Sequence, residues 1–261
     1  MYLRELQALI DKNIPVATVT IIEEKGSSPR GIGSNMLITA EGLISGSIGG
    51  GAIEYKAIKD AIEAIKDGKS STINYPLEKL DMTCGGEVTI FIQVYPRKKE
   101  VLIVGGGHIC RALLPLFNTL DYKTVVIDQR EDIFNDNVFS KSRCISADIL
   151  KGLASINYHN DLYIVIVTHG HEFDEATLGY VIAKSHAYVG MIGSKNKIQH
   201  CFESLIKKGV DKNLLKEIYA PIGLTLGGET PEDIALSIVS EIHAISNKQE
   251  IGHFKDALQL N

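Results

Sequence analysis

The stretch VLIVGGGHICRALLPLF, residues 101–117, decides the fold of the longer part of this chain. An apolar run typical of a buried strand leads directly into three glycines, and a segment typical of a helix follows. Gly105 and Gly107 occupy the first two positions of a dinucleotide-binding fingerprint. The first permits a tight turn, and the second lets backbone approach a pyrophosphate at the helix N-terminus. The third position holds Cys110 in place of glycine or alanine, which weakens the phosphate interpretation.

Asp128 supports the same interpretation from a second position. It ends the strand-like run KTVVID about 20 residues after the glycines, where an acidic residue accepts hydrogen bonds from a ribose. His108, directly after Gly107, is a further candidate for cofactor binding. The structural alternative is that the glycines form only a tight turn and Asp128 only caps a loop.

Strand-like and helical stretches alternate from here to the C-terminus. Strands separated by helices imply right-handed crossovers and a parallel sheet, so residues 98–261 are predicted to form a Rossmann-like, doubly wound α/β domain. The basic stretch YPRKKE, residues 95–100, places the domain boundary after residue 97. Residues 1–97 are predicted to form a smaller, β-rich α/β domain with one long helix at AIEYKAIKDAIEAIKDG and strands at PVATVTII, NMLIT, LISGS, STINY and EVTIFIQVY.

The composition excludes several classes of protein. The 261 residues include 27 Lys and Arg against 32 Asp and Glu, a net charge of −5 without basic blocks, which argues against sequence-independent nucleic-acid binding. No apolar run approaches the ~18 residues of a membrane span, and charged residues interrupt the N-terminus, so we expect a cytoplasmic protein. The four cysteines contain no CxxC pair, which makes a zinc ribbon or disulfide scaffold improbable.

Two glycine-rich joints of the first half are candidate anion-binding loops. EEKGSSPRGIGS offers Ser27, Ser28 and Arg30 on flexible backbone, although such a loop alone is more often a plain hairpin connection. GSIGGGAIEY opens a helix with the triple glycine 49–51, whose bare amides and helix dipole favour an anion. Glu54 in the first turn of this helix either caps it or faces a ligand.

A third joint, MTCGGEV, places Cys84 before Gly85 and Gly86. Amides of an open turn lower the pKa of a thiol and make it a soft ligand or a nucleophile. The alternative is that Cys84 is a small apolar filler, the usual role of a lone cysteine.

Two strand ends of the second half add candidates. LYIVIVTHGHEF ends in His169 and His171, and YVGMIGSKNK carries Gly193 before a helix. The carboxyl ends of parallel strands are where open α/β sheets bind ligands. Both histidines together with Asp174 suggest a metal site only weakly, because no further ligand spacing is evident.

These motifs together resemble the XdhC/CoxI family, with a match that spans nearly the whole chain. The resemblance rests on GSSPRGIGSNMLI, GSIGGGAIEY, TCGGEV, VLIVGGGHICRAL, VVIDQRED, VTHGHEFDEATL, YVGMIGSKNK and APIGLTLGGETPEDIALSI in this order. It implies an accessory protein that binds molybdenum cofactor, supports its sulfuration by a cysteine desulfurase and passes it to an apo molybdenum hydroxylase of the xanthine dehydrogenase type. A homodimer is a further possibility.

The resemblance also implies a site. Many relatives carry Cys after the triple glycine where this chain has Ala52, so Cys84 becomes the principal candidate for a catalytic thiol and molybdenum ligand. The expected cargo is the pterin or its cytidine dinucleotide form, which glycine-rich amide cradles suit. The candidate cofactor-binding residues are Ser27, Ser28, Arg30, Gly49, Gly50, Gly51, Glu54, Cys84, Gly85, Gly86, Gly105, Gly107, His108, Asp128, His169 and Gly193.

Two rival functions belong to other classes. An NAD(P)-dependent oxidoreductase with His169 or His108 as acid/base explains the second half but leaves the three joints of the first half unassigned. A nucleotide-sensing scaffold that binds a partner without chemistry is the other rival. The motifs favour a cofactor-binding chaperone over a catalyst.

Overall fold

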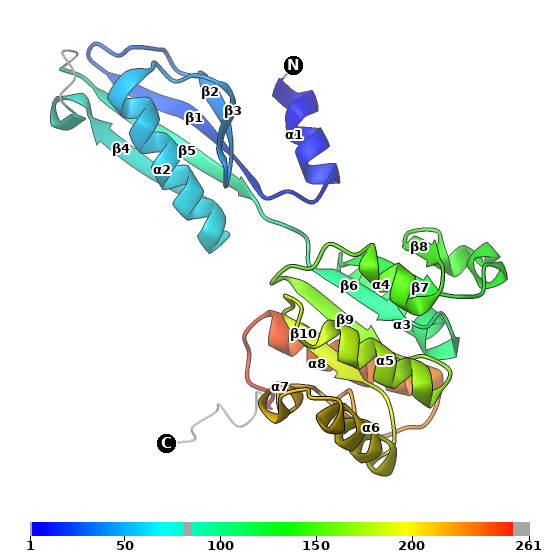
Figure 1. The fold of residues 1–261 in the computed structure, drawn as a ribbon. Coiled ribbons are helices and arrows are strands. Elements are labelled where there is room, and N and C mark those ends of the chain that lie inside the picture. Colours follow the sequence, from blue (N-terminus) through cyan, green and yellow to red (C-terminus); the bar gives the residue numbers. More distant parts are fainter. Residues whose placement is uncertain (1, 81–84, 253–261) are drawn as a thin grey trace, which may run out of the picture. The chain divides into compact units, whose positions relative to one another are not determined.

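The computed structural model describes residues 2–80 and 85–252 of the chain (Figure 1). The chain divides into two compact units, Met1–Lys98 and Lys99–Asn261. The division lies within the basic stretch YPRKKE. Each described helix is too short or too polar to cross a bilayer.

The first unit is an antiparallel sheet with the strand order β3-β2-β1-β5-β4. One long helix, α2, packs on one face of this sheet (Figure 1) through apolar residues spaced four apart, which lie on one side of a helix. Helix α1 packs on Val16 and Leu37 instead. The elements are α1 (Tyr2–Asp11), β1 (Val16–Lys25), β2 (Asn35–Thr39), β3 (Gly42–Gly46), α2 (Gly51–Asp67), β4 (Ser71–Pro76), the 3-10 turn η1 (Leu77–Leu80) and β5 (Glu87–Tyr95).

The second unit is a parallel sheet with the strand order β10-β9-β6-β7-β8. The chain runs outward from β6 through β7 to β8, then crosses back to place β9 on the other side of β6. The strands are β6 (Glu100–Val104), β7 (Lys123–Asp128), β8 (Arg143–Ser146), β9 (Leu162–Ile166) and β10 (Tyr188–Met191). The helices are α3 (His108–Thr119), η2 (Asp132–Asn135), η3 (Asn137–Phe139), α4 (Ile149–Ala154), α5 (His171–Val181), α6 (Lys195–Lys207), α7 (Lys212–Leu215) and α8 (Pro231–Ser246).

Apolar side chains fill both faces of this parallel sheet. Successive residues of β6 point to opposite faces, so Val101 and Ile103 join the core beneath α3 and α8. Leu102 and Val104 join the core beneath α4, α5 and α6. Helices therefore cover both faces (Figure 1), and the predicted fold class, a Rossmann-like doubly wound sheet preceded by a smaller β-rich α/β unit, is confirmed.

Helix α8 offers a matched test of this packing. Ile238 is fully buried in the core beneath α3 and α8, whereas Leu236, two residues earlier, is 51% exposed. We expect Ile238→Ala to lower the free energy of unfolding of the second unit by about 2–5 kcal/mol in urea titrations, because it leaves a cavity. Leu236→Ala should change this free energy by less than about 0.5 kcal/mol, and equal losses for the two variants would contradict this packing.

Candidate functional site

The turn between β6 and α3, residues 105–107, is the first part of the site, and we call it the glycine turn. Gly105 has φ +106, a left-handed value that favours glycine, and its amide donates to the Ile127 carbonyl at 2.9 Å. A Cβ on Gly105 would lie 2.5 Å from the Val167 carbonyl oxygen. Conformation and close packing against the end of β9 therefore both require a glycine here.

Gly107 differs from Gly105 because no contact among the described residues requires a glycine there. It is the N-cap of α3 with φ −75, and an added Cβ would meet no atom within 4 Å. The first N–H groups of a helix have no intrahelical acceptor and carry the positive end of the helix dipole. Bare backbone that faces open space at a helix N-terminus is the arrangement that admits a phosphate.

Asp128, at the end of β7, is buried and fully engaged by the protein's own donors. Its Oδ2 accepts from the Gly106 amide at 2.7 Å and from the Arg130 guanidinium at 2.8 Å. Its Oδ1 accepts from the Arg130 amide and from Arg130 Nε, both at 2.9 Å. These four hydrogen bonds match the about four lone-pair sites of a carboxylate, so a ribose hydroxyl would reach Asp128 only if Arg130 moved.

Electrostatics keep the Asp128 side chain ionised. Burial alone would raise its pKa, but the hydrogen bonds from the Arg130 side chain and from the amides of Arg130 and Gly106 outweigh burial and lower the pKa below its ordinary value of 3.8. The carboxylate thus fixes the middle of the glycine turn as a charged acceptor.

The segment after Asp128 covers Gly106, the middle of the glycine turn, a contact that the sequence patterns did not predict. A Cβ on Gly106 would collide with the Ile133 side chain of η2. Arg111, in the first turns of α3, pairs with Asp136 and stacks 5.3 Å from the centroid of the Phe139 ring. The one signal in the sequence was the pair of charges in IDQRED, where Arg130 follows Asp128 by two positions.

The end of β9 lies against the glycine turn. A Cβ on Gly105 would stand 2.8 Å from the Thr168 Cα, and Thr168 donates from its hydroxyl to the Asp174 carboxylate. His108, at the start of α3, and His169, after β9, are both exposed. Gly193 follows β10, just before Ser194 caps α6. The structure thus brings the glycine turn and Thr168 into direct contact.

The described residues contain no cluster of three or more His, Cys, Asp or Glu side chains that could hold a metal ion. Cys84, the predicted thiol and metal ligand, lies outside the described residues, as does the side chain of His171. Burial and the nearby Asp128 carboxylate raise the pKa of Cys110, which lies fully buried on α3. Burial likewise raises the pKa of Cys201 to about 11, so both of these thiols stay protonated at neutral pH.

The three glycine-rich joints of the first unit, which the sequence identified one by one, converge in space. A Cβ on Gly26, where φ is +76, would lie 3.2 Å from the Gly86 Cα, and a Cβ on Gly86 would lie 2.6 Å from the Lys25 carbonyl oxygen. A Cβ on Gly49, where φ is +132, would lie 2.5 Å from the Pro29 Cβ. We call residues 26–30, 47–51 and 85–86 the three-loop cluster.

Glu54 caps α2, which was one of the two predicted alternatives. Its Oε2 accepts from the Gly50 amide at 2.6 Å and from the Ser47 hydroxyl at 2.8 Å. The Gly50 amide is therefore engaged, and the amides left for an anion by helix geometry begin at Gly51. Ala52, the position of the relatives' cysteine, is exposed in this first turn.

The loop of residues 26–30 is partly ordered by its own polar groups. The Ser28 hydroxyl lies 2.9 Å from both Glu24 Oε2 and the Arg30 carbonyl oxygen, so it donates within the loop. Ser27 and Arg30 are exposed, as is Gly85, whereas Gly86 is buried and accepts from the Leu77 amide at 2.9 Å. Ser27 and Arg30 are thus the exposed polar side chains of this joint.

The strand order and the glycine turn define a Rossmann-type α/β protein with an added β-rich unit. Residues 101–242 match the family described as the XdhC Rossmann domain, and residues 9–76 match the XdhC and CoxI family. The chain belongs to the XdhC and CoxI family.

Two bacterial proteins are similar to this chain over part of their length. Uncharacterized protein YqeB of Escherichia coli (strain K12) is 29% identical over 93% of the chain and 46% of its own length. A probable xanthine dehydrogenase subunit of Bacillus subtilis (strain 168) is 26% identical over 59% of the chain and 44% of its own length. The chain thus spans less than half the length of these two relatives.

One further relative and one solved structure match over most of their own length. The molybdenum cofactor insertion chaperone PaoD of Escherichia coli (strain K12) is 20% identical over 89% of the chain and 84% of its own length. A crystal structure from Bacillus halodurans, described as a xanthine dehydrogenase, shares the fold with a TM-score of 0.54 and 19% identity, over 95% of this chain and 96% of that one.

The ionised state of Asp128 makes the stability of the second unit depend on pH. Because its pKa is lowered on folding, its stabilising effect is complete above the ordinary value of 3.8 and is lost as pH falls through the folded value. We expect Asp128→Asn to lower the free energy of unfolding by about 1–3 kcal/mol at pH 7, with a difference from wild type that narrows below pH ~4.

Urea unfolding across this pH range measures the effect. Asp132→Asn is the control, because Asp132 is exposed and makes none of the four hydrogen bonds to Asp128. A difference between wild type and Asp128→Asn that stays constant from neutral to acidic pH would show that the carboxylate charge does not stabilise the turn.

Proposed function

We propose that this protein is a molybdenum cofactor chaperone for a hydroxylase of the xanthine dehydrogenase type. It binds the cofactor as cargo, supports its sulfuration by a cysteine desulfurase and delivers it to the apo-enzyme. The open backbone at Gly107 is the observation that carries the proposal, because bare backbone at the N-terminus of α3, where an added Cβ would meet no described atom within 4 Å, suits a phosphate or pyrophosphate of the cargo.

Family membership supports the same function. PaoD is named as a molybdenum cofactor insertion chaperone, and the Bacillus subtilis relative is named as a probable subunit of xanthine dehydrogenase. The three-loop cluster adds a second region of close backbone packing, with Ser27 and Arg30 exposed for an anionic or polar group of the cargo.

The form of the cargo depends on Arg130. The pterin form needs the N-terminus of α3 for its phosphate. The cytidine dinucleotide form also carries a ribose, which reaches Asp128 only when Arg130 releases the carboxylate. Binding of the dinucleotide form therefore includes the energetic cost of breaking the hydrogen bonds between Arg130 and Asp128.

Substitution of Gly107 tests cofactor binding without disturbing the fold. We expect Gly107→Ala to change stability by less than about 1 kcal/mol, since its φ of −75 suits alanine. The methyl group would project toward the site of the phosphate, so the molybdenum content and pterin absorbance of protein purified from a cofactor-producing host should fall about tenfold.

Gly105→Ala is the contrasting control, because its left-handed φ and the Val167 carbonyl predict loss of stability together with loss of cofactor. If Gly107→Ala retains the cofactor fully, the glycine turn is not part of the cofactor-binding site. If the wild-type protein binds NADH and retains neither pterin nor molybdenum, the rival function of an NAD(P)-dependent oxidoreductase is favoured.

Cys84 carries the sulfur-handling part of the proposal. A soft thiolate suits a molybdenum or sulfur centre, so Cys84→Ser should reduce activation of the client hydroxylase while the melting temperature stays near that of wild type. Cys201→Ser is a matched control with a thiol that stays protonated at neutral pH. If Cys84→Ser lowers the melting temperature and the activation of the hydroxylase in proportion, the thiol contributes to packing. Unchanged activation of the hydroxylase would favour the nucleotide-sensing scaffold.

A further inference from the structure

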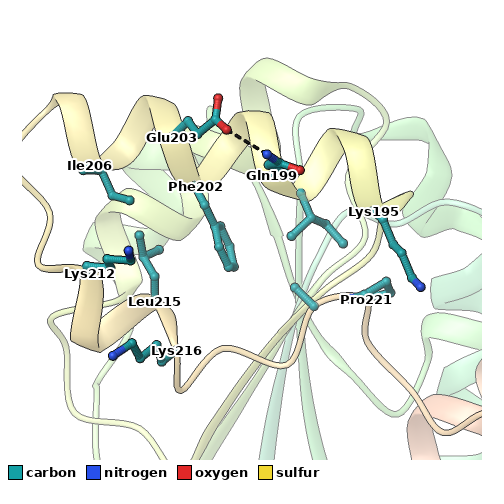
Figure 2. Close-up of a pocket in the computed structure, with 11 residues that line it drawn as sticks. Lys195, Gln199, Phe202, Glu203, Ile206, Lys212, Leu215, Lys216 and Pro221 are labelled. Atoms are coloured by element: carbon teal, nitrogen blue, oxygen red, sulfur yellow. Dashed lines mark hydrogen bonds between the residues drawn. The ribbon is translucent and has the colours of Figure 1, made fainter.

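Helices α6 and α7 border an open groove that the cofactor function does not use. The groove has a volume of about 580 Å³ and is closed on one side by the chain at Ala220 and Pro221. Figure 2 shows the Phe202 side chain projecting from α6 into the space between Leu215 and Pro221. The groove lies wholly within the second unit.

Apolar side chains form the floor of this groove. Ile198 and Leu215 are buried members of the core beneath α4, α5 and α6, and Phe202 packs against the same core. Ile206 extends the apolar surface outward and is 41% exposed. An apolar surface that continues from a core and stays open to solvent is typical of a binding groove.

The shape of the groove fits a helix. The lining residues of α6 recur at intervals of three and four from Lys195 to Ile206, so they form one face of the helix along nearly its whole length. At a rise of 1.5 Å per residue this face extends over about 16 Å, which corresponds to three turns of a bound helix. Helix-in-groove binding uses such elongated apolar faces.

The charge around the groove specifies the partner. Lys195 lies at one end and Lys212 and Lys216 lie at the other (Figure 2). Among the described residues that line the groove, Glu203 is the one acidic side chain. Glu203 accepts from Gln199 Nε2 at 2.9 Å. The three lysines and one glutamate that line the groove give it a net charge of +2, in a chain whose net charge is −5.

We propose that the groove between α6 and α7 binds an amphipathic helix of a partner protein, with apolar residues on the floor and acidic residues beside the lysines. The apolar contacts supply affinity, and the lysines select an acidic partner over a basic one. This binding does not depend on the cofactor function, so either can fail without the other.

Two synthetic peptides test the proposal on the full-length protein. Both are about 15 residues long, near the length at which isolated helices form, and share one leucine face, but one has Glu and the other Lys in the flanking positions. Fluorescence anisotropy should show the Glu peptide binding at least about tenfold more tightly than the Lys peptide, with an advantage that shrinks as salt is added.

Charge reversal sharpens the test. The double variant Lys212→Glu with Lys216→Glu should reverse the preference in favour of the Lys peptide, and Ile206→Ser should weaken binding of both peptides. Lys141→Glu is the control, because Lys141 is exposed, lies outside the groove and should leave the preference unchanged. Melting temperatures near that of wild type establish that the variants are folded.

Several outcomes would overturn the proposal. They are failure of wild-type protein to bind either peptide, equal binding of both, and an unchanged preference in the double variant. If sedimentation shows that the wild-type protein is a dimer and that Ile206→Ser dissociates it, the groove binds a second copy of the chain and not a partner helix. Tighter binding to anionic lipid vesicles than to the Glu peptide, lost in the double variant, would assign the groove to a membrane surface.

Discussion

The buried carboxylate of Asp128 is the interaction on which the second unit's site depends. It joins the end of β7 to the Gly106 amide and holds Arg130 through three hydrogen bonds. A buried charge without partners would be costly, so the glycine turn and the segment from Arg130 onward are fixed together. The backbone at Gly107 stays open to solvent at the N-terminus of α3. The Asp128 carboxylate is occupied by its hydrogen bonds to Arg130.

The first unit also uses glycine for close packing, here between three loops. In the three-loop cluster, Gly86 lets two backbone segments approach more closely than a side chain would permit, and Gly49 leaves room for the Pro29 side chain. Glu54 then supplies an acceptor at the start of α2 and engages the Gly50 amide. Gly49 thus packs against Pro29, and the Gly50 amide donates to Glu54. In this joint, the amides without an intrahelical acceptor begin at Gly51.

The order of strands in the second unit brings distant residues of the chain together. The chain adds β7 and β8 on one side of β6 and β9 and β10 on the other. The glycine turn after β6 therefore lies beside Thr168 after β9, in the position where open α/β sheets bind ligands. On another part of the same unit, the lysines of α6 and α7 form a positive border in a mildly acidic protein. The fold therefore separates backbone that suits a phosphate from a surface that suits an acidic helix.

The sequence by itself determined the order and kind of the main elements, because apolar periodicity and glycine position are local properties that survive in a linear chain. It also singled out Gly105, Gly107 and Asp128. Only the tertiary structure decided that Arg130 saturates Asp128, that Glu54 caps α2, and that the three joints of the first unit converge. These outcomes depend on which donors and backbone segments meet in space, and spacing along the chain does not encode those distances.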